Sequence, residues 1–167
     1  KNVAKAKEEI LVHGNKLGKG MDFFQIGGVQ ESADQNLVGY SVDTVGRRFF
    51  DLYFKDLKTS KLLADVIKDT TGGFAWANDN KTIFYVKQHP EAVRGYQLYR
   101  YELGLKEPPA LVFEEKDETY SLGLEKGRSD KWIFLTSWKR DSSEVRYLDA
   151  GEPLSEWNVF YRRQPDF

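Results

Sequence analysis

The sequence has no cysteine, and this absence excludes disulfide frameworks, zinc–thiolate sites and thiol nucleophiles. It also has no excess of charge of one sign, because 25 basic residues balance 26 acidic ones in a chain of 167 residues. Nucleic-acid-binding domains usually show strong basicity, so we expect no nucleic-acid partner. No apolar run approaches the roughly 20 residues that a membrane-spanning helix needs, so we expect no membrane partner either.

Motifs for catalysis or cofactor binding are missing as well. The sequence contains no Gly-x-Ser-x-Gly nucleophile elbow, no P-loop and no dinucleotide-binding fingerprint. The two histidines, His13 and His89, are far apart and belong to no cluster with metal-ligand spacing. We therefore expect no catalytic residue, cofactor or metal in this chain, and we predict that it is inactive by itself.

The start of the chain bears on its origin. The chain begins at Lys1 instead of Met and shows no basic-then-apolar leader. We therefore expect a piece processed or excised from a longer soluble protein of a reduced compartment.

What the sequence does contain favours β-strands. Aromatic residues make up 14% of the chain and lie in short apolar runs, which fit a pleated, half-buried surface. Polar clusters rich in Asn and Asp separate these runs at 33–36, 78–81 and 128–131, and such residues favour tight turns. The same order of turn, strand, loop and strand recurs, and it places Leu52, Leu98 and Val145 at equivalent positions, 46 and 47 residues apart.

Four strands in about 40–50 residues, repeated, are typical of the blades of a β-propeller. We predict an all-β propeller fragment of about three to four four-stranded blades, with blades at 22–70, 71–117 and 118–163. Residues 1–21 would form the outer end of a preceding blade. The alternative is a β-sandwich, which gives no reason for a period near 46. An arc of blades exposes end faces that normally stack on neighbours, so we also expect self-association.

Two loops are candidates for a charged rim. They join the second and third strands of two successive predicted blades, so they should emerge on the same face, and each carries an acid and at least one arginine. We predict that this rim contacts a partner domain, because the planar fork of arginine pairs well with carboxylates. The alternative is that Asp43 and Arg47 pair with each other in water, an interaction worth roughly 0–1 kcal/mol. The candidate rim residues are Asp43, Arg47, Arg48, Glu91 and Arg94.

Several runs resemble a known family. The chain contains GYSVDTVGR at 39–47, KDLKT at 55–59, TTGGFAWAND at 70–79, IFYVKQ at 83–88, QLYRYELG at 97–104 and VFEEKD at 112–117. These runs closely resemble the propeller of the oligopeptidases B (proteases II), a branch of the prolyl oligopeptidase family of serine peptidases. The resemblance is strong over about 8–117 and persists more weakly to the end.

The resemblance implies a seven-bladed propeller that caps a C-terminal α/β-hydrolase domain of the same protein. That domain would carry the Ser-Asp-His triad. In the family it follows the propeller, so no triad residue maps onto this chain. The enzymes of this branch cleave short peptides after Lys or Arg, and the propeller gates access. The loop at 43–48 matches a region that faces the hydrolase domain. We expect a cytoplasmic location, with the periplasm as the alternative. The competing function is a stand-alone propeller that binds proteins without catalysis, because propellers host many unrelated functions.

Overall fold

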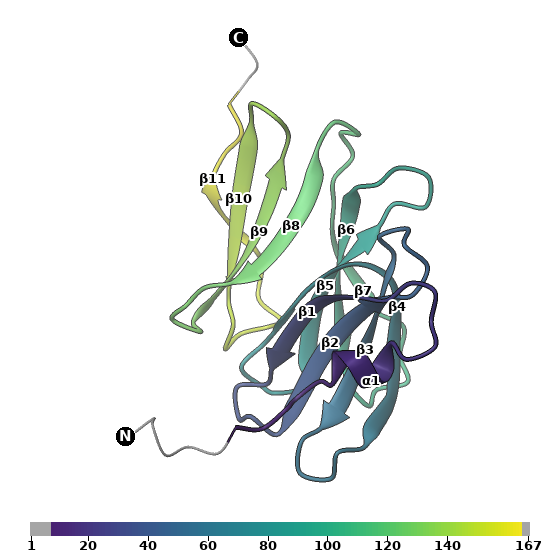
Figure 1. Cartoon of the computed structure of the whole chain (residues 1–167). Coiled ribbons are helices and arrows are strands. Elements are labelled where there is room, and N and C mark those ends of the chain that lie inside the picture. The colour runs from purple at the N-terminus through teal and green to yellow at the C-terminus, as the bar shows by residue number, and fades with distance from the viewer. Residues whose placement is uncertain (1–7, 165–167) are drawn as a thin grey trace.

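The computed structural model describes residues 8–164, and within them the architecture is all-β and antiparallel, as predicted (Figure 1). Strands β1 to β7 form one sheet in sequence order, and strands β8 to β11 form a second sheet. The strands are β1 (Gln25–Glu31), β2 (Leu37–Asp43), β3 (Phe50–Asp56), β4 (Leu62–Trp76), β5 (Thr82–Gln88), β6 (Gly95–Glu102), β7 (Ala110–Glu114), β8 (Ser121–Lys126), β9 (Trp132–Trp138), β10 (Ser143–Asp149) and β11 (Asn158–Tyr161).

Strand β4 belongs to two blades. Its first part, up to Thr70, pairs with β3, and its second part, from Thr70 onward, pairs with β5. Positive φ angles at Asp69 (57°) and Gly72 (92°) mark the change of direction between the two parts. We therefore name three blades: the first holds β1 to β3 and the start of β4, the second holds the end of β4 and β5 to β7, and the third holds β8 to β11. The predicted division between 70 and 71 falls inside β4, and the blade limits as a whole stay a prediction.

The blades stack face to face, with the second blade in the middle. One apolar cluster joins the first and second blades through Leu52, Phe54, Phe74 and Trp76, among others. Another cluster joins the second and third blades, where Phe84 and Val86 meet side chains such as Leu135. Strand β5 is therefore buried on both faces, which explains its continuous apolar run, as in other doubly covered strands. Three stacked layers differ from the two-layer sandwich that was the alternative.

The predicted turns are confirmed, and they share one backbone feature. Gln35, Asn80 and Asp130 occupy equivalent places in the three turns and have φ angles of 59°, 63° and 57°. Asn and Asp tolerate this left-handed conformation better than most residues do. The first two turns are joined by a hydrogen bond, because the backbone N–H of Asp34 donates to Oδ1 of Asn80 at 2.8 Å.

The N-terminal segment lies against the first blade. It contains the short helix α1 (Gly14–Leu17), which the sequence did not predict. Gly14 and Gly18 lie against Ile26 and Phe24, so that a Cβ at Gly18 would come within 2.7 Å of the Phe24 ring. Residues 8–21 form no strand, and their assignment to a preceding blade stays a prediction; residues 1–7 lie outside the described part. No helix within 8–164 is long and apolar enough to span a bilayer.

Candidate functional site

Asp43 shapes the first candidate loop from the end of β2. Its side chain is 1% exposed, and Oδ1 accepts hydrogen bonds from the backbone N–H of Val45 (2.8 Å) and of Gly46 (2.9 Å). Oδ2 accepts a third, from the backbone N–H of Arg48 at 2.8 Å. The tight loop needs left-handed φ angles at Gly46 (83°) and at Arg48 (60°). Asp43 therefore fixes the loop from inside instead of presenting its charge on the rim.

Hydrogen bonds from the backbone stabilise the ionised form of the Asp43 carboxyl. Burial raises the pKa of its carboxyl, but the hydrogen bonds from backbone N–H groups lower that pKa more, so it lies below its ordinary value. Among residues 8–164, no ion pair joins Asp43 to Arg47. The alternative, in which these two side chains pair with each other, is therefore wrong. The guanidinium groups of Arg47 and Arg48 form no ion pair within the same residues, and both residues are exposed.

The second candidate loop is built in a similar way around a histidine. Nδ1 of His89 accepts hydrogen bonds from the backbone N–H of Glu91 (3.2 Å) and of Ala92 (3.0 Å). The His89 ring packs edge-on against Tyr96, with ring centroids 4.9 Å apart. His89 thus takes the part in the second loop that Asp43 takes in the first. The sequence signal for this role was position: His89 directly follows the second strand of its blade, and Asp43 ends the second strand of the first blade.

Arg94, at the end of this loop, is held in place. Its Nη1 donates to the carbonyl oxygen of Tyr120 at 3.1 Å, and its guanidinium lies 5.8 Å from the centroid of the Tyr96 ring. Glu91, by contrast, is exposed and makes contact through its backbone. The loop therefore presents one anchored cation and one exposed acid.

A pocket of about 290 Å³ brings parts of both loops together. Its lining includes Gln25 at the start of β1, Thr71 at the start of the second part of β4 and Ser121 at the start of β8, so all three blades contribute to it. Of the predicted rim residues, Arg48 and Arg94 line this pocket, whereas Asp43, Arg47 and Glu91 do not. Its polar lining residues are Gln25, Arg48, Thr71, Gln88, Arg94 and Ser121.

A buried ionic cluster, which the sequence did not predict, lies between the second and third blades. Glu115 is 5% exposed, and its carboxylate accepts hydrogen bonds from the hydroxyl of Ser137 and from Nη2 of Arg163, the latter at 2.5 Å. The guanidinium of Arg163 also lies 4.0 Å from the centroid of the Tyr120 ring. This cluster fixes the linker after β7 to the third blade. No group of three or more His, Asp or Glu side chains within 8–164 is arranged to hold a metal ion.

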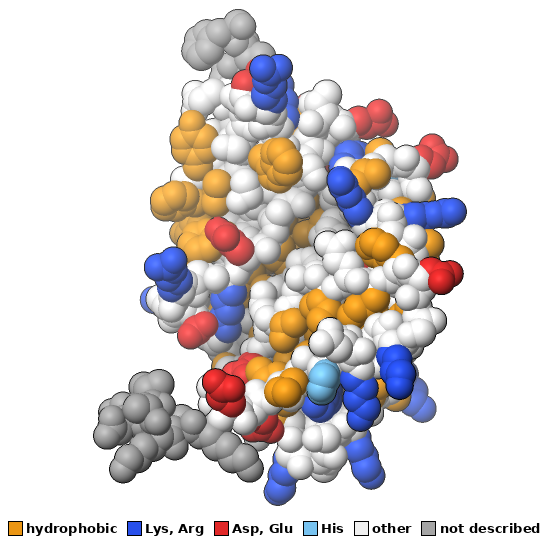
Figure 2. Space-filling model, in the orientation of Figure 1, with side chains coloured by type: hydrophobic (Ala, Val, Ile, Leu, Met, Phe, Trp, Pro, Cys, Tyr) orange, Lys and Arg blue, Asp and Glu red, His pale blue; other side chains and the backbone are white. Residues whose placement is uncertain are grey.

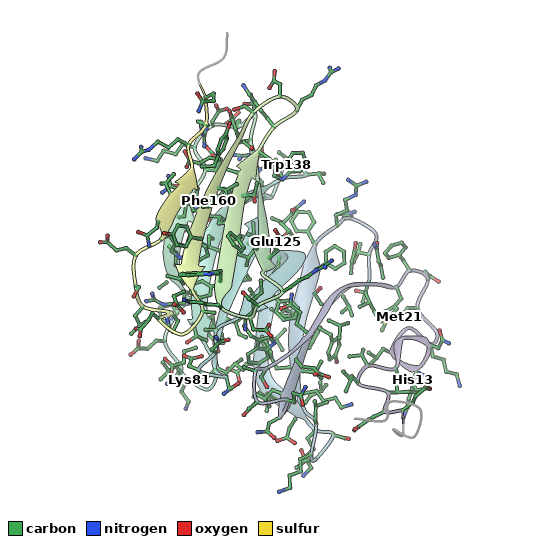
Figure 3. The ribbon with its side chains drawn as sticks, turned by 90° about the vertical axis from the view of Figure 1, so that its left-hand side faces the viewer. His13, Met21, Lys81, Glu125, Trp138 and Phe160 are labelled. Atoms are coloured by element: carbon green, nitrogen blue, oxygen red, sulfur yellow. The ribbon has the colours of Figure 1, made fainter. Side chains whose placement is uncertain are left out.

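The third blade leaves apolar side chains exposed. Hydrophobic side chains gather over the sheet of β9 to β11 in Figure 2, amid charges of both signs elsewhere on that face. Figure 3 shows Phe160 and Trp138 on this sheet, and they are 73% and 51% exposed. Such a face favours association, and self-association stays a prediction.

Comparison with known proteins identifies related sequences. The family model described as "Prolyl oligopeptidase, N-terminal beta-propeller domain" matches residues 1–166. The chain is 35% identical over 149 residues to dipeptidyl aminopeptidase BI of Pseudoxanthomonas mexicana, covering 89% of this chain and 21% of that protein. It is 33% identical over 164 residues to Protease 2 of Moraxella lacunata, covering 95% and 23%. The chain therefore spans about a fifth of the length of these curated relatives.

Solved structures share the fold. Oligopeptidase B from Leishmania major superposes with a TM-score of 0.85 at 23% identity, over 93% of this chain and 22% of that one. The closed form of oligopeptidase B from Trypanosoma brucei, with covalently bound antipain, superposes with a TM-score of 0.80, also at 23% identity and over 93% and 22%. At this identity the likeness shows the propeller fold.

Proposed function

The chain belongs to the prolyl oligopeptidase family, and from that premise we propose that it is the capping propeller segment of a serine peptidase that hydrolyses short peptides after Lys or Arg. The match of residues 1–166 to the family's propeller model carries this proposal. The catalytic α/β-hydrolase domain of the same protein would be its partner, and this segment would supply no triad residue. The names of two relatives, a dipeptidyl aminopeptidase and a protease, support a peptidase activity.

The chemistry of such an enzyme explains what a cap contributes. Attack by a serine requires a preorganised site with oxyanion donors, and these donors act most strongly where water is excluded. A propeller that closes over the cleft excludes water and folded proteins together. Closing and opening of such a cap can then limit turnover.

Within this scheme, we assign the loop at 43–48 to the closed state. Asp43 holds the loop in one shape through three backbone hydrogen bonds. Arg47 and Arg48 are exposed and form no ion pair within residues 8–164. Two unpaired guanidinium groups on a rigid loop are suited to carboxylates on a facing domain.

The test is the double variant Arg47→Ala, Arg48→Ala in the full-length protein. Each ion pair from the rim to the facing domain would be worth at most about 1 kcal/mol, so we expect kcat/KM to fall by about fivefold for each arginine that makes one. Thermal unfolding should be unchanged, because both side chains are exposed. Arg128→Ala is the matched control, since Arg128 is an exposed arginine in the turn at the opposite ends of the strands. Unchanged kinetics of the double variant would remove the gating assignment.

Two simpler observations test the rest of the proposal. A Gly-x-Ser-x-Gly element downstream in the reading frame is expected for the peptidase, and its absence there would contradict the proposal. We also propose a cytoplasmic location, and fractionation of the native cells should recover the protein with cytoplasmic markers and not with periplasmic ones.

A further inference from the structure

We propose that the pocket between the loops at 43–48 and 89–94 binds the terminal carboxylate of a short peptide. The identity of the ligand as a peptide rests on the proposed function, whereas the preference for a carboxylate rests on the pocket itself. Arg48 and Arg94 reach the pocket from two different blades, and no acidic residue lines it. The pocket therefore carries positive charge and no built-in counterion.

Gln88 adds a further hydrogen-bonding group to the pocket. It is 5% exposed and lines the pocket, and its side-chain amide makes no hydrogen bond to any residue within 8–164. Within 8–164, the buried side-chain atoms without a hydrogen-bond partner are Ser142 Oγ and Arg146 Nε, so the Gln88 amide is not sealed off and can be reached from the pocket. A ligand oxygen in the pocket would satisfy this amide.

Two further groups leave donors available to the same ligand. The hydroxyl oxygen of Ser121 accepts a hydrogen bond from the backbone N–H of Gly95 at 3.1 Å, so its own hydrogen can be donated elsewhere. One nitrogen of Arg94 donates to the carbonyl oxygen of Tyr120, which fixes the guanidinium while its other N–H groups stay free to bind. Preorganised donors of this kind lose little conformational entropy when a ligand binds.

The lining also distinguishes a peptide terminus from a bare anion. Phe50, Val93 and Leu122 form an apolar part of the wall, beside the two arginines. A terminal amino-acid residue has both a planar carboxylate, which matches the arginine fork, and an apolar part that this wall would cover. Inorganic phosphate offers nothing to the apolar side chains.

The experiment compares two peptides that differ only in a free C-terminal carboxylate or a carboxamide, with the full-length protein. We expect kcat/KM to favour the free carboxylate by about tenfold, as expected when a hydrogen bond to a charged group is removed. Arg48→Met and Arg94→Met should bring this ratio close to one, and Gln88→Met should reduce it in part. Arg140→Met is the matched control and should keep the ratio, because Arg140 is exposed in the corresponding loop of the third blade and does not line the pocket.

Equal rates for the two peptides with the wild-type protein would overturn the proposal. It would also be overturned if the variants slowed both peptides equally, since the pocket would then receive a carboxylate of the facing domain. Arg48 is exposed, so its variant stays informative even if removal of the Arg94 hydrogen bond to Tyr120 impairs folding. Calorimetric binding of N-acetyl-alanyl-alanine and of its carboxamide separates the two proposals: preferred binding of the acid without hydrolysis of any peptide would refute only the peptidase.

Discussion

Replacing Asp43 with asparagine exchanges one of the two carboxylate oxygens that shape the first loop for an NH2 group. The remaining oxygen can serve either the N–H groups of Val45 and Gly46 or that of Arg48, but not both sets. At least one backbone N–H then faces another donor at a site that is 1% exposed. Hydrogen bonds to charged groups contribute about 1.5–3 kcal/mol, so Asp43→Asn should lower the free energy of unfolding by about 2 kcal/mol.

The dependence of stability on pH offers a second measurement of the same interaction. The pKa of Asp43 is lower in the folded protein than its ordinary value, so the folded state binds this proton less readily than the unfolded state does. The stabilisation is therefore fully present above the ordinary carboxyl pKa and is lost as pH falls toward the lower folded value. Denaturant unfolding of the full-length protein at several pH values should show a smaller loss on acidification in Asp43→Asn than in the wild type.

Asp141→Asn is the matched control, because Asp141 lies in the corresponding loop of the third blade with its side chain 74% exposed. That change should alter stability by less than about 0.5 kcal/mol. If the gating assignment is correct, Asp43→Asn should also lower kcat/KM, since Arg48 then loses its fixed position. Equal stability of Asp43→Asn and Asp141→Asn would refute the reasoning that the buried carboxylate shapes the loop.

The repeat could be predicted because its signals are local. Leu52, Leu98 and Val145 do lie in equivalent strands, β3, β6 and β10. Alternating apolar residues and turn-forming Asn and Asp act over a few neighbouring positions, so a single sequence displays them. The regular spacing then implied stacked blades without any knowledge of long-range contacts.

The continuous course of β4 was not predicted. The sequence suggested that one blade ends at 70 and a new blade begins at 71, whereas the single strand β4 runs through this boundary. Backbone rotation at Asp69 and Gly72 lets the chain change blades without a turn. Only the two adjacent glycines at 72 and 73 hint at this, and glycine pairs are also common in ordinary turns.

The candidate site could be predicted only in part. The two loops were correctly placed after second strands, but their acids were expected to act at the surface. Asp43 instead binds backbone N–H groups, because three fixed donors a few residues away outcompete one mobile guanidinium in water. The meeting of Arg48, Gln88 and Arg94 depends on how the blades stack, which local sequence patterns do not encode.

Interactions between blades yield the remaining predictions. The indole N–H of Trp76 donates to the carbonyl oxygen of Gln30 at 3.1 Å across the first and second blades, so Trp76→Phe should cost about 2 kcal/mol of unfolding free energy. Trp138→Phe, at a site 51% exposed, is its control and should change stability by less than about 0.5 kcal/mol; equal effects would contradict the interblade role. Burial raises the pKa of Glu115, but the hydrogen bonds from Ser137 and Arg163 lower it more, so its stabilisation should be present above the ordinary carboxyl pKa and be lost as pH falls. Glu115→Gln leaves the partly buried Arg163 without its nearest anion, and we expect a loss of about 3 kcal/mol in denaturant unfolding at neutral pH. The difference in unfolding free energy between Glu115→Gln and the wild type should shrink on acidification, because Glu115 of the wild type is then protonated. A difference that stays constant with pH would show that the ion pair is not its cause.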